Sequence, residues 1–298
     1  MKGFDVTTYT PTIPGPDPNT KTPKFKLPPK SCDAHCHIFG PGHKYPYAPD
    51  RTYTPPDAPL DAFRKLHAIL GVERAVIVNA SAHGTDNRVA LDAIAVSNGA
   101  YRAVANIDDT ITDKGLRELH EGGFRGCRFN FVRHLGGVPD MKVFDRVVSM
   151  IAPLGWHLNL HFDAIDLPQY AKMLEKLPCT YIIDHMGRVK ASDGLEQEPF
   201  RILLDLMKND EKAWVKVCGS ERVSSSGPPF HDAAPFAAKL IEVAPDRCVW
   251  GTDWPHPNVK AMPNDGDLVD LVPLFAKDVD AQEKILVKNP ARLYGWED

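Results

Sequence analysis

Short apolar runs recur along the chain from residue 31 onward, and stretches with helical spacing separate most of them. The runs are rich in β-branched and aromatic side chains, which is typical of parallel strands buried on both faces. The pattern predicts eight strands, over residues 32–37, 74–79, 102–107, 126–131, 156–161, 180–184, 214–218 and 247–251.

The clearest helical stretch covers residues 60–70. Its apolar residues share one stripe, and Gly71 follows as a stop signal. Further helices are predicted over residues 85–96, 116–120, 143–152, 167–177, 199–208 and 235–243.

Eight strand-helix units in this order match an α/β fold, a (β/α)8 barrel of the TIM type, which takes about 250 residues. A doubly wound open sheet is the alternative, but no G-x-G-x-x-G follows the first strand. Residues 39–59 form a predicted loop that contains three tyrosines. In a barrel, a loop at this position covers the mouth of the active site.

Composition narrows the class of protein. Hydrophobic residues make up 43% and charged residues 25%, which is typical of a globular chain. The net charge is −4 and no basic block is present, which argues against a nucleic-acid partner. A small anionic ligand needs only a few arginines in a pocket, so the negative net charge does not argue against such a ligand.

The first thirty residues contain seven prolines and no apolar core, so they do not resemble a secretory signal. We expect residues 1–30 to be an extended lead-in and residues 31–298 to be one barrel domain.

Cellular location is inferred from cysteines and apolar runs. The six cysteines contain no C-x-x-C and fit free thiols in a reducing compartment, so a cytoplasmic location is expected. Apolar runs are too short for a membrane span. The oligomeric state cannot be predicted.

His35 and His37 lie two residues apart at the end of the first predicted strand. Strand alternation places both rings on one face, here the barrel interior. Two imidazoles so placed are half of a divalent-metal site, although two hydrogen-bonded histidines would give the same pattern.

Three other strands also end in polar residues. His161 ends the fifth strand, His185 follows the sixth, and Asp253 follows the eighth. Barrel enzymes build their sites from residues at these ends. The combination favours a metal or catalytic site over independent core histidines.

These motifs resemble the amidohydrolase superfamily: D-x-H-x-H, a strand-end histidine, D-H-M-G and G-T-D-W-P. More narrowly, they are similar to the branch that contains the 2-pyrone-4,6-dicarboxylate hydrolases. The resemblance covers residues 30–296 and depends on segments 33–40, 81–87, 126–131, 184–188, 251–258 and 289–294. It implies a (β/α)8 barrel.

The resemblance also implies the metal ligands. Typical pyrone-dicarboxylate hydrolases have a tyrosine at the position of His161 and work without a metal, whereas metal-dependent relatives have a ligating histidine there. This chain therefore offers four ligands to one divalent ion, with Zn²⁺ expected: His35, His37, His161 and Asp253.

Two departures concern the substrate. His134 stands where the pyrone enzymes have a carboxylate-binding arginine, and Gly219-Ser220 replaces a Cys-Pro pair. Both changes fit the metal-dependent 4-sulfomuconolactone hydrolases of this branch, whose lactone carries one carboxylate and one sulfonate.

Roles follow from the resemblance. Asp253 would move the proton of the attacking water, and His185 would polarise the lactone carbonyl. Arg128 and Arg222 would bind the anionic groups of the substrate, and Arg188 is a further candidate for this role. Other predicted substrate contacts are Tyr53, Ser81, His83, Asn130, His134 and Asn258.

Some of these residues have structural alternatives. Arg188 could instead be an ordinary surface arginine. Arg128 could pair with a structural aspartate, and His83 could cap a helix. His67 and His120 are predicted to be structural. So is His157, which we expect to point away from His161.

The predicted function is a metal-dependent lactone hydrolase of aromatic-compound catabolism, acting on a small anionic lactone, with 4-sulfomuconolactone favoured. The alternatives are a metal-independent 2-pyrone-4,6-dicarboxylate hydrolase, a metal-dependent decarboxylase and a barrel that only binds. The chain retains all the proposed ligands and the base, which argues against the last.

Overall fold

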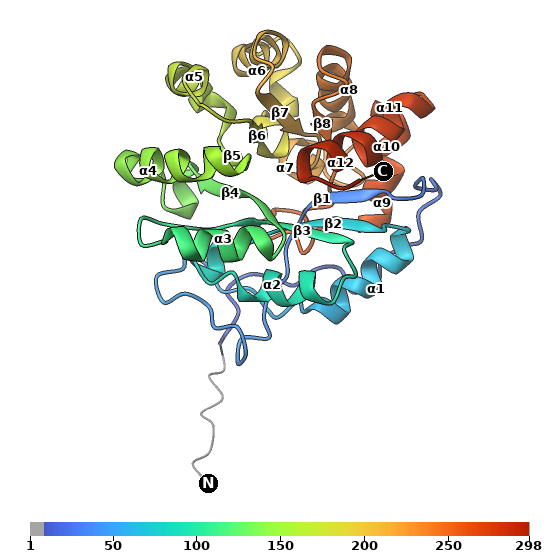
Figure 1. Cartoon of the computed structure of the whole chain (residues 1–298). Helices are drawn as coiled ribbons and strands as arrows, with labels where there is room; N and C mark the ends of the chain where they lie inside the picture. The colour runs from blue at the N-terminus through green and yellow to red at the C-terminus, as the bar shows by residue number, and fades with distance from the viewer. Residues whose placement is uncertain (1–8, 298) are drawn as a thin grey trace.

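The computed structural model describes residues 9–297 and places eight parallel strands in one sheet, in the order β1 to β8 (Figure 1). Each strand overlaps a predicted one, so the predicted barrel is confirmed. The predicted lead-in and domain include residues 1–8 and 298, which lie outside the described residues. The strands are β1 Cys32–Cys36, β2 Arg74–Val78, β3 Tyr101–Ala105, β4 Phe124–Asn130, β5 His157–His161, β6 Tyr181–Ile183, β7 Ala213–Lys216 and β8 Cys248–Val249.

Backbone hydrogen bonds join the segment that follows the last strand to the first strand. The Ala34 N–H donates to the Trp250 carbonyl (2.9 Å), and the Asp253 N–H donates to the His35 carbonyl (2.7 Å). The segment after β8 therefore continues beside β1. This closure holds Asp253 next to the histidines of β1.

An irregularity in β1 determines where its histidines point. The β1–β2 ladder shifts register between Asp33 and Cys36. Ala34 packs in a cluster with side chains from β2, β3, β6, β7 and β8, which can meet only inside the barrel. Cys36 instead packs in the cluster beneath the helices. Strict alternation from Ala34 would turn His35 and His37 toward the helices, and the inserted residue turns them inward.

Helices surround the sheet (Figure 1). Those that were predicted are α1 Leu60–Leu70, α2 Arg88–Ala95, α3 Asp113–Glu121, α4 Met141–Ile151, α5 Leu167–Glu175, α6 Glu198–Asn209 and α8 Ala234–Val243. Short helices that were not predicted are α7 Ser220–Val223, α9 Asp265–Asp270, α10 Val272–Phe275, α11 Val279–Glu283 and α12 Asn289–Tyr294. Within residues 9–297, every helix falls short of the length and apolar content that crossing a membrane requires.

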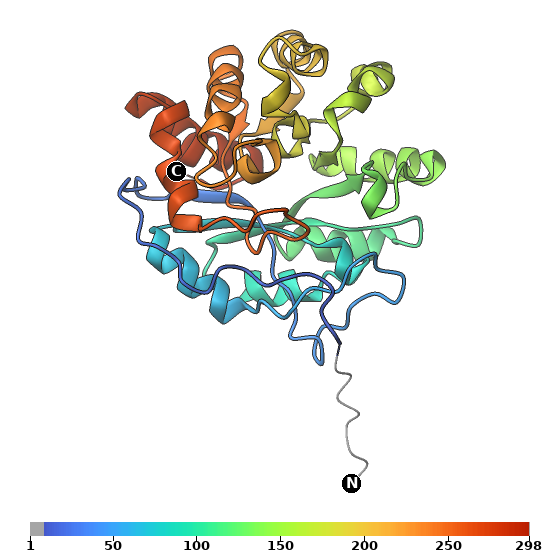
Figure 2. The ribbon, with the colours of Figure 1, turned by 180° about the vertical axis from the view of Figure 1, so that it is seen from behind.

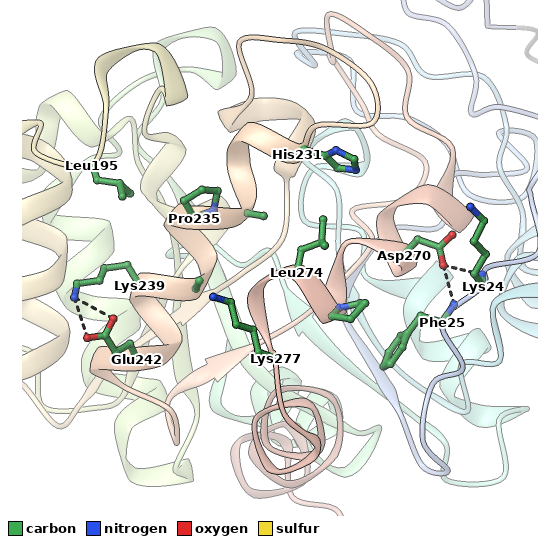
Figure 3. Close-up of a pocket in the computed structure, with 13 residues that line it drawn as sticks. Lys24, Phe25, Leu195, His231, Pro235, Lys239, Glu242, Asp270, Leu274 and Lys277 are labelled. Atoms are coloured by element: carbon green, nitrogen blue, oxygen red, sulfur yellow. Dashed lines mark hydrogen bonds and ion pairs between the residues drawn. The ribbon is translucent and has the colours of Figure 1, made fainter.

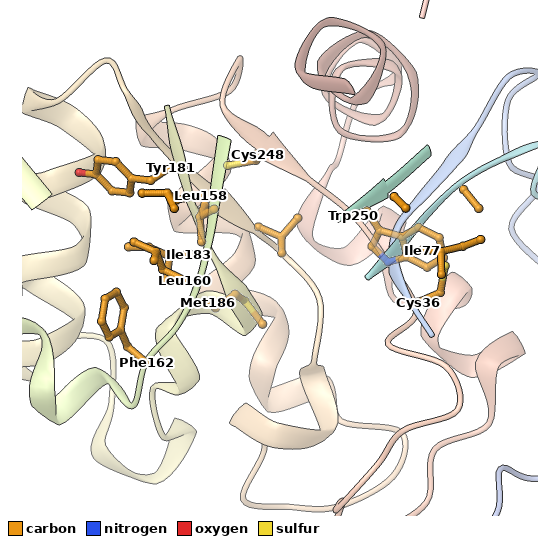
Figure 4. Packing of buried hydrophobic residues seen from close by; sticks show 14 of the residues in the cluster. Cys36, Ile77, Leu158, Leu160, Phe162, Tyr181, Ile183, Met186, Cys248 and Trp250 are labelled. Atoms are coloured by element: carbon orange, nitrogen blue, oxygen red, sulfur yellow. The ribbon is translucent and has the colours of Figure 1, made fainter. Parts of the chain in front are cut away.

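Most of the apolar core lies between the strands and the helices. Leu158 and Leu160 of β5 gather with Tyr181 and Ile183 of β6 on the helix side of the sheet (Figure 4). This packing leaves the opposite face of β5, including His161, directed into the barrel.

Residues 9–31 form no helix or strand and run along the barrel toward α9 (Figure 2). The Lys21 N–H donates to Asn264 Oδ1, and the N–H groups of Lys24 and Phe25 donate to Asp270 Oδ1. These bonds tie the lead-in to α9 and the residue before it.

Asp33, the first residue of the D-x-H-x-H motif, occupies a structural position. Its fully buried carboxylate accepts hydrogen bonds from Thr252 Oγ1 (2.6 Å), from the His35 N–H (3.1 Å) and from His67 Nε2 (3.2 Å). These hydrogen bonds therefore connect β1 to α1 and to the segment after β8. The predicted structural role of His67 agrees with this contact.

We expect Asp33→Ala to lower the free energy of unfolding by about 3 kcal/mol, because several buried donors lose their acceptor. Urea denaturation measures the change. Asp109→Ala, at an exposed position, is the control and should stay within about 0.5 kcal/mol of the parent. Equal stability of the two variants would contradict the structural role.

Candidate active site

The predicted metal and catalytic residues gather at the carboxyl ends of four strands. His35 and His37 lie at the end of β1, His161 ends β5, His185 follows β6 and Asp253 follows β8. Each of them is at most 3% exposed. TIM-type enzymes place their chemistry at this end of the barrel.

The tautomer of His37 is fixed by the backbone. Its Nδ1 lies 2.7 Å from the Val78 carbonyl oxygen, which can only accept, so Nδ1 carries the proton. In the neutral ring, Nε2 then presents a lone pair to Asp253 Oδ1 at 3.3 Å. Two acceptors face each other across this contact.

His35 lies beside the same carboxylate. Its Nε2 is buried, has no hydrogen-bond partner among the residues that the structure describes, and lies 3.5 Å from Asp253 Oδ1. One ligand atom each from His35, His37 and Asp253 lies within 4.8 Å of the others, so these three can hold a metal ion. Burial, and then the charge of Lys216, lower the pKa of His35 to about 4, so its ring is neutral at pH 7.

His161 lies between a donor and an acceptor. Its Nδ1 is 3.0 Å from Arg128 Nη2 and 3.1 Å from Asn130 Oδ1. The Arg128 contact requires a lone pair on Nδ1, whereas the Asn130 contact requires a proton there and leaves Nε2 free as a ligand. Nε2 is buried without a hydrogen-bond partner among residues 9–297. His161 is not part of the three-residue ligand group, and its role as a fourth ligand stays a prediction.

His185 is held in a left-handed conformation, with φ of 52°. Its Nδ1 lies 3.3 Å from Cys218 Sγ, and its Nε2 lies 3.9 Å from Asp253 Oδ1. A Cβ on Gly219 would come within 2.8 Å of His185 Nδ1, so the glycine there makes room for the ring. Burial lowers the pKa of His185 well below its usual value.

Asp253 has its two oxygens in different environments. Oδ1 faces the histidines, and Oδ2 accepts from Arg222 Nε at 2.8 Å. Burial by itself raises the pKa of Asp253, but the charge of Arg222 and the neighbouring histidines lower it well below its usual value. Arg222, a predicted substrate ligand, therefore holds the predicted base in place.

The sequence analysis assigned no role to two buried charged residues, Asp184 and Lys216. Asp184 Oδ1 lies 3.2 Å from His35 Nδ1, and Lys216 Nζ lies 3.0 Å from the same nitrogen. Both side chains are fully buried. A signal was present for Lys216, because a lysine inside an apolar strand is almost never fully buried unless it is paired.

The site encloses a cavity of about 20 Å³. A second hollow of about 330 Å³ shares Ser81, Arg128 and Leu135 with it. Ligand pockets have volumes of about 300–1,000 Å³, and the second hollow falls within this range. Predicted substrate-binding residues that line the first cavity are Tyr53, Ser81, Arg128, His134, Arg222 and Asn258.

Three predicted substrate contacts lie outside that lining. The His83 ring packs on Tyr47 under the loop that follows β1, with centroids 4.9 Å apart. Asn130 lines the second hollow. Arg188 Nε pairs with Asp163 Oδ1 at 2.7 Å, in agreement with the structural alternative for this arginine.

The predicted direction of the His157 side chain was wrong, whereas its predicted structural role agrees with its position. Residues 157 and 161 are an even number apart on β5, so both side chains point into the barrel. The His157 ring lies 5.1 Å from the ring of Tyr294, a member of the interior cluster. Burial lowers the pKa of His157 to about 3, so it is a neutral interior side chain.

His120 accepts a hydrogen bond from Trp156 Nε1 at 2.9 Å, as a structural histidine would.

A groove of about 910 Å³ lies away from this site, between the lead-in, α8 and α10 (Figure 3). Several charged side chains that line this groove are bonded to neighbouring residues. Lys239 Nζ pairs with Glu242 Oε1 at 2.9 Å, and Asp270 accepts the N–H groups of Lys24 and Phe25. We assign it no catalytic role.

Comparisons with known proteins agree with this geometry. The amidohydrolase family model matches residues 32–296. The chain is 44% identical over 289 residues to a 2-pyrone-4,6-dicarboxylate hydrolase of Comamonas testosteroni, covering 94% of this chain and 95% of the relative. It is also 44% identical over 285 residues to a 4-sulfomuconolactone hydrolase of Hydrogenophaga intermedia, covering 94% of each. A Pseudomonas putida structure, named as a candidate 2-pyrone-4,6-dicarboxylic acid hydrolase, superposes with a TM-score of 0.80 at 30% identity, over 91% of this chain and 100% of that one.

Proposed function

The chain belongs to the amidohydrolase family, and from this premise we propose that it is a metal-dependent lactone hydrolase. The proposed substrate is 4-sulfomuconolactone, a small anionic lactone from the breakdown of aromatic compounds, and the proposed metal is Zn²⁺. One observation supports the proposed metal site. His37 Nε2 and Asp253 Oδ1 lie 3.3 Å apart, and the proton of the ring is held on the other nitrogen. A cation between these two acceptors would turn a repulsive contact into a favourable one.

The donors present fit a divalent ion. Within the described part of the chain, His35 Nε2 and His161 Nε2 are buried nitrogens without hydrogen-bond partners, and Asp253 adds an oxygen. Imidazoles combined with one carboxylate are typical of catalytic zinc sites. A divalent ion bound there would lower the pKa of water toward 7 and polarise a carbonyl.

The protein's own residues supply the proton transfer. Asp253 lines the cavity and Arg222 holds its Oδ2, so the carboxylate is oriented to take a proton from water and return it to the leaving ring oxygen. The Cys218 thiol can donate to His185 Nδ1, which puts the proton of the ring on Nε2. His185 Nε2 can then donate to the lactone carbonyl.

The lining of the cavity supports a carboxylate together with a weakly basic second anion. Arg128 supplies a guanidinium. Burial, and then nearby arginines, lower the pKa of His134, which therefore acts as a neutral donor. Arg222 already bonds Asp253. Of these two lining arginines, Arg128 has the weaker carboxylate contact, at 3.6 Å from Asp184 Oδ2, and one such guanidinium favours a sulfonated lactone over a dicarboxylate.

A specific contact supports a second candidate, the metal-independent hydrolysis of 2-pyrone-4,6-dicarboxylate. The 3.0 Å contact from Arg128 Nη2 to His161 Nδ1 places the proton of that ring on Nε2, where it cannot bind a metal. In this case His161 would donate to the substrate.

Metal content and hydrolysis measured on one sample distinguish these candidates. We expect about one zinc per chain after purification without chelators, hydrolysis of 4-sulfomuconolactone, loss of activity with a chelator and recovery with Zn²⁺. Full activity toward 2-pyrone-4,6-dicarboxylate without metal would favour the second candidate. Release of carbon dioxide would instead indicate a decarboxylase.

We expect His161→Tyr to reduce bound zinc by about tenfold or more at a fixed Zn²⁺ concentration, because a ligand nitrogen is lost. Metal analysis after equilibrium dialysis measures this. His43→Tyr makes the same change at an exposed position and should keep the parent's metal content. Unchanged zinc in His161→Tyr would remove His161 from the ligand set.

A further inference from the structure

We propose that Lys216 is a positioning residue that holds His35 in the tautomer unable to bind a metal, and so weakens the metal affinity of the site. The proposal rests on the metal site of the proposed function. Lys216 comes from β7 and is fully buried, with Nζ 3.0 Å from His35 Nδ1. Burial lowers the pKa of Lys216, but its ion pair with Asp184 Oδ1 at 3.5 Å favours the ammonium form, which has no lone pair and can only donate to this nitrogen.

The same nitrogen has a competing neighbour. Asp184 Oδ1 lies 3.2 Å from His35 Nδ1, and a carboxylate can only accept. A neutral imidazole carries one proton, so Nδ1 can satisfy Lys216 or Asp184 but not both. Donation from Lys216 leaves the proton on Nε2. Acceptance by Asp184 draws the proton to Nδ1 and frees the Nε2 lone pair for a metal.

The surroundings of Nε2 favour the Lys216 state in the absence of metal. Asp253 Oδ1 lies 3.5 Å from His35 Nε2. With the proton on Nε2, an N–H faces this carboxylate and a lone pair faces Lys216, so both contacts are attractive. With the proton on Nδ1, a lone pair faces the carboxylate and an N–H faces the ammonium, so both are repulsive. A metal ion removes the first repulsion and has to overcome the second.

Asp184 keeps other partners when Lys216 is removed. Asn159 Nδ2 donates to its Oδ1 at 2.6 Å, and Arg128 Nε lies 3.6 Å from its Oδ2. The carboxylate therefore retains a donor and a cation. It can accept from His35 Nδ1 without Lys216, and the metal-binding tautomer becomes the favoured one.

Two substitutions beside one nitrogen should change metal affinity in opposite directions. Lys216→Met removes the competing donor, and we expect its Zn²⁺ dissociation constant to fall about tenfold in competition with a fluorescent chelator. Asp184→Asn weakens the acceptor, and we expect that constant to rise about 10- to 100-fold. Lys212→Met is the matched control, because Lys212 Nζ donates to the backbone carbonyls of Glu175 and Leu177, away from His35. Its affinity should match the parent's.

The tautomer is measured independently of metal. Nitrogen NMR of metal-free protein labelled at histidine should show the His35 proton on Nε2 in the parent and on Nδ1 in Lys216→Met. If this change occurs but the parent binds no Zn²⁺, the proposed function fails and the role of Lys216 stands. Lys216→Gln keeps a neutral donor, should bind Zn²⁺ with intermediate affinity, and replaces the Met variant if that one does not fold. The same tautomer in parent and variant, or unchanged affinity, overturns the proposal.

Discussion

Asp253→Asn should lower kcat/KM for lactone hydrolysis by about 10³-fold, the largest loss expected at any single position. The amide keeps the shape of the side chain but cannot take a proton from water. In the parent, the charge of Arg222 and the nearby histidines overcome the effect of burial and lower the pKa of Asp253, so the carboxylate stays ionised at neutral pH. Loss of lactone absorbance measures the rate.

Asp280→Asn is the matched control for this prediction. Asp280 is an exposed carboxylate that pairs with Lys284 and Lys288 on the surface, so the same substitution there should leave kcat/KM unchanged. A loss of less than about tenfold in Asp253→Asn would assign the proton transfer to another group. Circular dichroism on both variants separates catalysis from misfolding.

The barrel could be predicted because its signals are local. Each strand is a short apolar run, as in residues 181–183, and the apolar stripe of α1 ends at a glycine. The helices after β8 were missed because prolines such as Pro273 and Pro290 divide that region into pieces too short to show a period. The proximity of His35 and Asp253 could be predicted because the carboxyl ends of all the strands lie at the same end of a barrel.

The partners of the site residues could not be predicted, because they depend on contacts between distant strands. His35 and Lys216 are 181 residues apart in the chain. Alternation alone cannot locate the inserted residue between Asp33 and Cys36, although that insertion turns His35 inward. Arg222 was predicted from its motif as a substrate ligand, but only the fold shows that Asp253 engages it.

Charge balance explains why one of the predicted arginines should matter more than the others. Arg188 pairs with Asp163, and Arg222 with Asp253. Arg128 is also buried, but its contacts are a 3.6 Å approach to Asp184 Oδ2 and a hydrogen bond to the neutral ring of His161. It lines both the small cavity and the adjoining hollow. Its guanidinium is therefore the one best placed to meet an incoming anion.

Arg128→Met should reduce kcat/KM for an anionic lactone by about 10²- to 10³-fold, mainly through KM, because a desolvated partner of the substrate carboxylate is lost. Initial rates over a range of lactone concentrations separate KM from kcat. Arg125→Met on the same strand is the control, since Arg125 Nη1 donates to the carbonyls of His120 and Phe124, and its kinetics should match the parent's. A neutral lactone of the same ring size should lose little in Arg128→Met. An equal loss for the neutral and anionic lactones would instead mean that Arg128 acts through Asp184 and His161 on the geometry of the site.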